Sequence, residues 1–427
     1  MFTSYWEAYS LALVPYRTCK LFGAIRVVLG IRGSVVLIHG PRGCAYHIRY
    51  LLGVRGPFSG VILTTQMNER DVIFGASEKL QNAILQVDKE YSPELIAVLT
   101  SCASSIIGED VDSVIRSVKD DVKAKIIFVP AGGFEGDHID GYKEALNVIV
   151  KELVSEPERK LEDSVNLVAL YRFGPDVKDL LNLLSKLEVN VNGILTVNSS
   201  LDVLRKLSEA SLNVIMCEAS GFEAAHLMEK LYNIPFVYST LPIGIASTER
   251  FLLKVLEGLD KEPKLPEPVE KEKRLAVKEI EKVAEHLKGL RVAIISGSTR
   301  IAPLTEFVWE LGMEPVVVSI DRLGEVTLEL LDMVVKEHSL SPRVLKEPDY
   351  REVLDTLKEE KVDLILGGLY ERSLSYELNV PLYDIMHGEE RTMGFKNATL
   401  LAQNIFSKIK NWKHEKPMED FKCRYGK

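Results

Sequence analysis

Five cysteines have the clearest capacity for chemistry in this sequence: Cys19, Cys44, Cys102, Cys217 and Cys423. Cys44 lies in HGPRGCAYH, directly after the apolar run VVLI, where a buried strand should turn into a helix. This stretch looks like a phosphate loop but lacks the Gly-Lys-Ser/Thr that such a loop needs. No C-x-x-C pair occurs, which excludes zinc ribbons and ferredoxin-type signatures. Sparse cysteines in a reducing compartment are more often core residues, metal ligands or catalytic groups than disulfide partners.

Length and composition are those of an ordinary globular protein. The 427 residues suggest about three domains, and 46% of them are hydrophobic and 27% charged. A net charge of −9 gives no indication of nucleic acid or an anionic membrane as partner. The N-terminal sequence has no secretory signal, and no apolar run reaches the roughly 18 residues of a membrane helix. We therefore expect a cytoplasmic protein.

Short runs rich in Val and Ile alternate with helical stretches along the whole chain. Their continuous hydrophobicity indicates strands buried on both faces, as in parallel sheets. The runs are VVLIHG, ELIAVLTS, KIIFVPAG, VNLVALY, GILTV, NVIMC, IPFVYS, RVAIISG, EPVVVSI, VDLILGG and VPLYDIM. The pattern predicts an α/β protein with three Rossmann-like units, each with a parallel sheet flanked by helices.

Two breaks divide the predicted strands into groups. Residues 258–275 are rich in Pro and charge and predict a linker, with a helix following at 274–288. A weaker break lies at residues 153–164. We therefore predict a first α/β domain at 1–160, which also holds the first three cysteines, a second at 161–290 and a third at 291–427.

Ligands in open α/β sheets bind beyond the carboxyl ends of the strands. The residues at those ends include three of the five cysteines, more than we expect by chance, although buried cysteines also pack well as simple core residues. These strand-end positions are Cys44, Cys102, Gly132–Gly133, Cys217, Ser296–Ser298 and Gly367–Gly368.

Several segments resemble the nitrogenase component 1 family. TCKLFGAIRVVLGIRGSVVLIHGPRGCAYHIRYLLG resembles the first cysteine segment of its subunits, closest to the beta type and the related scaffold subunit. TTQMNERDVIFGASEKLQNAI resembles the next segment, although Ala76 stands where the family turn has a second glycine. Further matches are PELIAVLTSCASSIIGEDVDSVI, FVPAGGFEGDHIDGY and LPIGIASTERFL. Together they cover most of the chain.

The resemblance implies an iron–sulfur protein in which Cys19, Cys44 and Cys102 ligate a [4Fe-4S] or P-cluster-like cluster. Gly43 would let the backbone approach it. Three ligands are one short for a four-iron cluster, so a partner subunit or a non-cysteine group must complete it. The resemblance therefore implies a homo- or hetero-dimer partner of the same family, and a separate ATP-dependent iron protein as electron donor. The alternative is that these cysteines are buried structural thiols.

Cys217 and His387 are further candidates for cofactor binding. The segment around Cys217 resembles the alpha-type segment whose cysteine ligates the active-site cofactor. The alpha type also has a histidine before a Gly-Phe pair, but this chain has Met393 there, and His387 lies six residues earlier. The cysteine of the alpha-type cofactor site is therefore matched, but its histidine is not. The site would take a second metallocofactor or a tetrapyrrole in an interdomain cleft, or else Cys217 is a packed cysteine and His387 an ordinary loop residue. We assign no catalytic residue.

Several other polar residues allow either a functional role or a purely local structural one. His39 either orients the cluster loop or caps it, and Glu109–Asp110 is expected to cap or form ion pairs locally. Arg42, His47 and Arg49 either line a cleft for an anion or are simply solvated, which we favour. No function is expected for Cys423.

Two functions fit these residues. The first is a subunit of a nitrogenase-like two-component reductase, which passes electrons through an interface iron–sulfur cluster to a substrate or metallocofactor. The second is a non-catalytic scaffold for assembling a nitrogenase-type metallocofactor.

Overall fold

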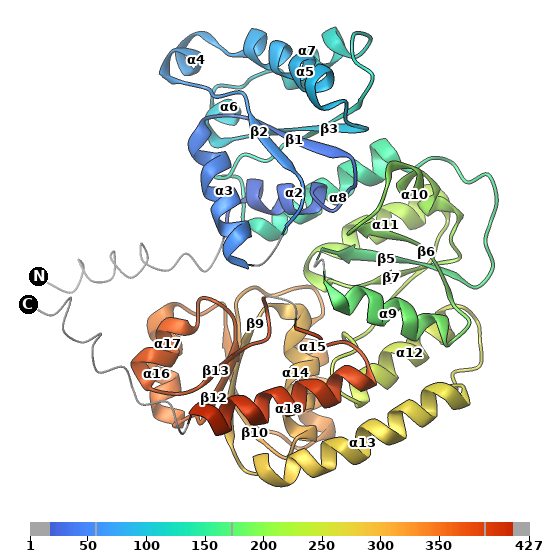
Figure 1. The fold of residues 1–427 in the computed structure, drawn as a ribbon, viewed down its shortest axis with the longest axis vertical. Coiled ribbons are helices and arrows are strands. Elements are labelled where there is room, and N and C mark those ends of the chain that lie inside the picture. Colours follow the sequence, from blue (N-terminus) through green and yellow to red (C-terminus); the bar gives the residue numbers. More distant parts are fainter. Residues whose placement is uncertain (1–17, 56–57, 172–173, 388–389, 413–427) are drawn as a thin grey trace, which may run out of the picture. The chain divides into compact units, whose positions relative to one another are not determined.

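In the part of the chain that the structure describes, thirteen strands form three separate sheets, and every pairing within them is parallel (Figure 1). This computed structural model describes residues 18–412 except 56–57, 172–173 and 388–389. Among these residues, 18–239 and 252–264 form one compact unit with two sheets, and 240–251 and 265–412 form another with the third sheet.

The first sheet has the strand order β2-β1-β3-β4. Its strands are β1 (Ser34–His39), β2 (Val61–Thr64), β3 (Leu95–Thr100) and β4 (Lys125–Val129). Side chains of a strand alternate between the two faces, so Val36 and Ile38 pack on one face while Val35 and Leu37 pack on the other. Figure 1 shows the helices on both faces: α2 (Lys20–Val28), α3 (Arg42–Arg55) and α8 (His138–Leu153) on one, α5 (Ser77–Tyr91) and α7 (Val111–Val118) on the other.

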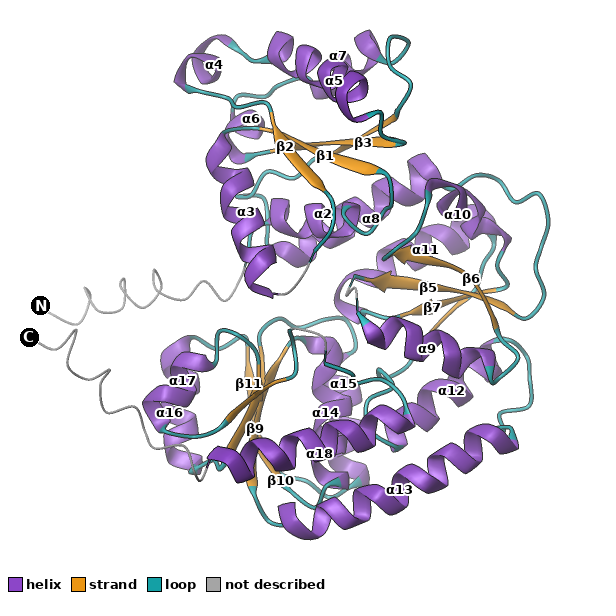
Figure 2. Cartoon of the chain, in the orientation of Figure 1, coloured by secondary structure: helices purple, strands orange, loops and turns teal. Residues whose placement is uncertain are grey.

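The second sheet belongs to the same compact unit and has the order β6-β5-β7-β8. Its strands are β5 (Ser164–Leu170), β6 (Asn190–Thr196), β7 (Leu212–Ile215) and β8 (Phe236–Tyr238). Figure 2 shows α9 (Pro175–Ser185) and α11 (Glu218–Tyr232) on opposite faces of this sheet. One hydrophobic core, which includes residues of α8 and α11, joins the first two sheets. Between β6 and β7 lie α10 (Leu201–Arg205) and a 3-10 turn (Lys206–Glu209).

The third sheet forms the core of the other unit, with the order β11-β10-β9-β12-β13. Its strands are β9 (Arg291–Ser296), β10 (Glu314–Ile320), β11 (Arg343–Lys346), β12 (Leu364–Gly367) and β13 (Leu382–Asp384). Figure 2 shows α16 and α17 on one face and α14 and α15 on the other. The helices are α13 (Glu267–Leu287), α14 (Ser298–Glu310), α15 (Thr327–Glu337), α16 (Tyr350–Glu360), α17 (Arg372–Leu378) and α18 (Phe395–Trp412), and α12 (Ala246–Gly258) runs from one unit into the other.

The predicted fold class is confirmed, and all eleven predicted runs contain strands. The structure adds β2 and β11, two edge strands of four residues. Both are short, and their apolar runs are only three (VIL) and two (VL) residues long. The predicted linker at 258–275 was too long, because α13 already begins at Glu267. A proline in the first turn costs no helical hydrogen bond, so Pro268 does not delay the helix. The three domain boundaries stay a prediction.

No helix in the described ranges is long and apolar enough to cross a membrane.

Two glycines let α2 and α8 cross at very short range. A β-carbon on Gly23 would lie 2.0 Å from the carbonyl oxygen of His138, and one on Gly141 would lie 1.9 Å from that of Lys20. Both obstacles are backbone atoms, which cannot swing aside as a flexible side chain does. The crossing fixes the start of α2, and therefore Cys19, which directly precedes it.

Gly23→Ala should lower the free energy of unfolding by about 1–3 kcal/mol, because the methyl group forces the two helices apart. The matched control is Gly53→Ala in α3, where a β-carbon would meet nothing within 4 Å. That change should be neutral or stabilise by about 0.5–1 kcal/mol through helix propensity. Denaturant unfolding of both variants measures the difference. Equal stabilities would contradict the tight crossing.

Candidate cysteine cluster

Cys44 and Cys102 follow β1 and β3, the two neighbouring strands of the first sheet from which the chain continues toward opposite edges. β1 and β3 are neighbours, but the chain leaves β1 toward β2 at one edge and leaves β3 toward β4 at the other. The loops after such a strand pair separate and leave a crevice, which is the usual ligand site of an open parallel sheet. Cys44 is the third residue of α3, after β1, and Cys102 is the first residue of α6 (Cys102–Ile106), after β3.

Backbone contacts hold these two cysteine loops together. The carbonyl oxygen of His39, the last residue of β1, accepts hydrogen bonds from the Ser101 N–H (3.2 Å) and the Ser104 hydroxyl (2.7 Å). A β-carbon on Gly40 would lie 2.5 Å from that of Ser101, so only glycine allows this approach. Ser101 also caps the short helix that Cys102 begins.

Cys19 reaches the same edge of the sheet from α2. It is the N-cap residue of that helix and forms an isolated antiparallel bridge with Asp137, at the start of α8. The Lys20 N–H donates to the carbonyl of Gly136 at 3.0 Å. The loop between β4 and α8 therefore holds Cys19 in place.

Gly133, in that same loop, lies against two of the sulfurs. A β-carbon on it would be 3.0 Å from Cys102 Sγ and 3.4 Å from Cys19 Sγ. The two sulfurs therefore flank one point in space, although they are 83 positions apart in the sequence. Glycine is the residue that leaves room for both.

The third thiol, that of Cys44, lies close enough to Cys19 and Cys102 for their charges to affect its pKa. Burial raises the pKa of Cys44, and the charges of Cys102 and Cys19 raise it further. Three thiolates held this close repel one another unless a cation neutralises them, and thiolate sulfur prefers soft metals. The donor set therefore fits a thiophilic metal or an iron–sulfur cluster.

The thiol site is open toward the outside of this chain. Cys19 and Cys102 are exposed, while Cys44 is half-buried. Exposed large apolar side chains lie close to these cysteines in the sequence, on α3, on α6 and beside Gly133. They are Tyr46, Tyr50, Ile106 and Phe134. Large exposed apolar side chains are frequent where another molecule covers a surface.

Cys217 occupies the corresponding position in the second sheet. It follows β7 and is the N-cap residue of α11. β5 and β7 are neighbours at the point where this sheet's order divides, and Tyr171 directly follows β5. The Cys217 sulfur accepts a hydrogen bond from the Ser220 hydroxyl at 3.2 Å, and that hydroxyl lies 2.9 Å from the Tyr171 oxygen.

His387 belongs to the other compact unit, and its ring has partners there. Its Nδ1 lies 3.1 Å from Asp384 Oδ1 and 3.2 Å from the backbone nitrogen of Leu369. Burial alone would raise the pKa of Asp384, but the hydrogen bond and charge of His387 lower it below its ordinary value. Met393 is buried, and its backbone pairs with Ile243. A cofactor role of His387 stays a prediction.

The acidic pair after Cys102 has the expected local role. Asp110 caps α7 by accepting from the Ser113 N–H at 2.9 Å, and Glu109 accepts from the Ala76 N–H and the Ser77 hydroxyl. Glu109 Oε2 also lies 3.8 Å from Nε2 of the fully buried His39.

His39 is part of the frame beneath the cysteine loops. Burial lowers the pKa of His39, although the charge of Glu109 opposes this. His39 Nδ1 lies 3.1 Å from the Thr65 hydroxyl. The imidazole thus packs inside the domain, while its backbone carbonyl orients the turn before Cys102. Cys423 lies outside the described residues.

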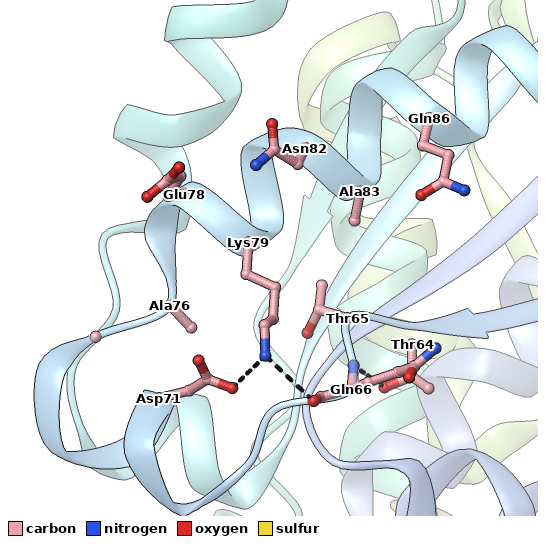
Figure 3. A pocket seen from close by; sticks show the side chains of 11 residues that line it. Thr64, Thr65, Gln66, Asp71, Ala76, Glu78, Lys79, Asn82, Ala83 and Gln86 are labelled. Carbon is pink, nitrogen blue, oxygen red and sulfur yellow. Dashed lines mark hydrogen bonds and ion pairs between the residues drawn. The ribbon is translucent and has the colours of Figure 1, made fainter.

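A polar pocket of about 450 Å³ lies apart from the thiols, beside β2 and α5 (Figure 3). Figure 3 shows Lys79 pointing toward Asp71 and the Gln66 carbonyl, so its charge is already paired. This pair links α4 (Glu69–Phe74), a helix with no buried residue, to α5. The pocket is lined by Thr64, Thr65, Gln66, Asp71, Gly75, Ala76, Glu78, Lys79, Asn82, Ala83 and Gln86.

One group of side chains in the described part of the chain has a spacing suited to a hard metal ion: Glu306, Glu337 and His338. The guanidinium of Arg250 forms ion pairs with both carboxylates, at 2.9 and 3.2 Å. An arginine thus already supplies the positive charge there.

Sequence reasoning missed Ser220 and Tyr171. Hydroxyl residues are common, and only the fold brings these two to Cys217. Gly133 was noted as a strand-end residue, but its contact with two cysteines appears only in the structure.

Comparisons with known proteins find matches that cover nearly the whole chain. Residues 19–410 match the family described as nitrogenase component 1 type oxidoreductase. The nitrogenase iron-molybdenum cofactor biosynthesis protein NifE of Clostridium pasteurianum is 29% identical over 407 residues, covering 92% of this chain and 87% of that protein. The nitrogenase molybdenum-iron protein alpha chain of Methanothermobacter marburgensis is 28% identical over 421 residues, covering 92% and 88%.

A solved structure of nitrogenase Cp1 at pH 6.5 superposes with a TM-score of 0.84, covering 96% of this chain and 95% of that chain. At 22% identity, this match shows a shared fold.

Gly133→Val should weaken binding of Cd²⁺, a thiophilic probe, to the metal-free protein by about tenfold or more, because its methyl groups would displace two sulfurs. Gly53→Ala is the control and should bind as the wild type does. Sulfur-to-metal charge-transfer absorption follows the titration. Unchanged affinity in Gly133→Val would show that the thiols do not converge at this glycine.

Proposed function

We propose a function from the premise that this chain belongs to the family of nitrogenase component 1 type oxidoreductases, whose description matches residues 19–410. It is a subunit of a nitrogenase-like two-component reductase. It takes electrons from an ATP-dependent iron protein through an iron–sulfur cluster held by Cys19, Cys44 and Cys102. It passes them to a substrate or metallocofactor at Cys217. The contact of Gly133 with two of the three sulfurs is the observation that carries this proposal.

The three thiols fit an iron–sulfur cluster in number, chemistry and placement. Thiolates are the usual ligands of such clusters. Burial and the charges of Cys102 and Cys19 raise the pKa of Cys44, and the positive charge of bound iron would offset both effects. Gly43 faces open space, since a β-carbon there would meet nothing within 4 Å. This open side leaves room for a cluster beside the backbone.

A partner subunit of the same family is needed to complete the site. Three cysteines leave one iron of a four-iron cluster without a protein ligand, and two of these thiols are exposed. Tyr46, Ile106 and Phe134 are 76%, 71% and 61% exposed. Such side chains are typical of the centre of an interface rather than of free surface. Dimerisation through this face would bury the cluster.

The apolar ridge of α4 is a suitable contact for the iron protein. Val72, Ile73 and Phe74 are three consecutive exposed apolar residues on a helix with no buried residue. The pair of Lys79 and Asp71 and an N-terminal capping box hold this helix in place (Figure 3).

A continuous path of contacts leads from the thiol site to Cys217 within one compact unit. His138 follows Asp137, the bridge partner of Cys19, and its ring meets Tyr142 edge-on at 5.5 Å between centroids. Tyr142 stacks on Tyr171 at 4.5 Å. Such a packed route supports electron transfer between the two cysteine sites.

An assembly scaffold is the second candidate. The position expected for a cofactor-binding histidine holds the buried Met393, so a cofactor bound through Cys217 alone would be easier to release. The similarity to a NifE cofactor biosynthesis protein favours the same function.

Cys44→Ala should remove the iron and sulfide of the interface cluster from protein purified without oxygen, because two thiols cannot retain the cluster. Cys217→Ala is the matched control and should keep the interface cluster. Chemical iron and sulfide assays with EPR spectroscopy measure both. Wild-type content in Cys44→Ala would falsify the ligand assignment.

Phe134→Glu should weaken dimerisation by about 2 kcal/mol, close to thirtyfold, since a charge would be buried in the interface. The control is Leu275→Glu on α13, where the wild-type side chain is 56% exposed. Analytical ultracentrifugation gives the dissociation constants. If both variants dimerise as the wild type does, the interface lies elsewhere.

The two candidate functions differ in turnover. With ATP, dithionite and its iron protein, a reductase consumes reductant in proportion to a reduced product. A scaffold instead releases its cofactor to an acceptor protein without turnover.

A further inference from the structure

We propose that Ser220 and Tyr171 are positioning residues for Cys217, and that together they form a directed hydrogen-bond chain that stabilises negative charge on its sulfur. This inference rests on the proposed function, in which Cys217 ligates a metallocofactor.

The direction of the chain follows from counting protons. A serine hydroxyl has one proton, and the Ser220 hydroxyl donates it to Cys217 Sγ at 3.2 Å. The contact between the Ser220 and Tyr171 oxygens, at 2.9 Å, then needs its proton from Tyr171. The chain therefore runs from the Tyr171 O–H through Ser220 to the sulfur. Both donors point toward Cys217.

The surroundings hold this chain in one arrangement. Ser220 is 1% exposed, so solvent does not compete for its hydroxyl. The Tyr171 ring stacks on the buried Tyr142 with 30° between the ring planes, which fixes the direction of its hydroxyl.

Such an arrangement is more than a packed cysteine needs. A neutral thiol is only a weak hydrogen-bond acceptor, whereas a metal-bound thiolate is a strong one. A fixed donor stabilises the thiolate and takes electron density from the metal. Hydrogen bonds to cysteine sulfur are among the features that set the potential of an iron site. Ser220 and Tyr171 should therefore raise the reduction potential and slow the loss of metal.

The test compares Ser220→Ala, Ser220→Thr and Tyr171→Phe with the wild type, using anaerobically purified, iron-loaded protein. Redox titration follows the EPR signal that Cys217→Ala abolishes, and a chelator measures the rate of iron release from the same site. The control is Ser373→Ala, whose hydroxyl donates to the Tyr370 carbonyl in the other compact unit.

Ser220→Ala should shift the midpoint potential to a more negative value and speed iron release by about tenfold, the effect of losing one hydrogen bond to a charged group. Ser220→Thr retains the hydroxyl and should restore both values. Tyr171→Phe should shift both in the same direction but less, since Ser220 still reaches the sulfur. Ser373→Ala should change neither.

Two outcomes would overturn the inference, and they are distinguishable. If Cys217→Ala removes an iron signal but Ser220→Ala leaves its potential and release rate unchanged, Cys217 is a ligand without this hydrogen-bond support. If Cys217→Ala leaves every iron signal in place, Cys217 is not a ligand and the hydrogen-bond chain has no metal to serve. The second outcome leaves the cluster at Cys19, Cys44 and Cys102 untouched.

Discussion

The convergence of three cysteine sulfurs is the constraint on which this structure depends. Cys19, Cys44 and Cys102 lie at one edge of one sheet; burial raises the pKa of Cys44, and the charges of Cys102 and Cys19 raise it further. A fold gains nothing by assembling negative groups unless a cation compensates them. The helix crossing at Gly23 and the close approach at Gly40 both serve to hold these sulfurs together.

The same geometric rule places both cysteine sites. In each sheet of the larger unit, the chain direction divides between two neighbouring strands, and the functional residues follow those strands. Cys44 and Cys102 do so in the first sheet, and Tyr171 and Cys217 in the second. The stack of Tyr142 on Tyr171 then links the two sites through a shared core. One architecture is thus used twice, and the proposed function places electron transfer between these two sites.

Much of the fold was predictable because strands buried on both faces leave continuous apolar runs in the sequence. The edge strands β2 and β11 contain only the short apolar runs VIL and VL, and the start of α13 was hidden by charge and proline. The placement of Cys44 and Cys102 at neighbouring strand ends was predictable from the sequence, whereas the ligand role of Cys19, Cys44 and Cys102 was inferred from the family resemblance and stays a prediction. The contacts of Gly133 and the alignment of Ser220 with Tyr171 were not, because tertiary packing alone brings together residues that local patterns cannot connect.

The most direct test of the central claim is an anomalous difference map at the iron absorption edge, from crystals grown without oxygen. The account predicts an iron peak within bonding distance of the sulfurs of Cys19, Cys44 and Cys102, beside Gly133 and at the contact with a second subunit. A map of the intact protein with no iron at these three sulfurs would contradict it.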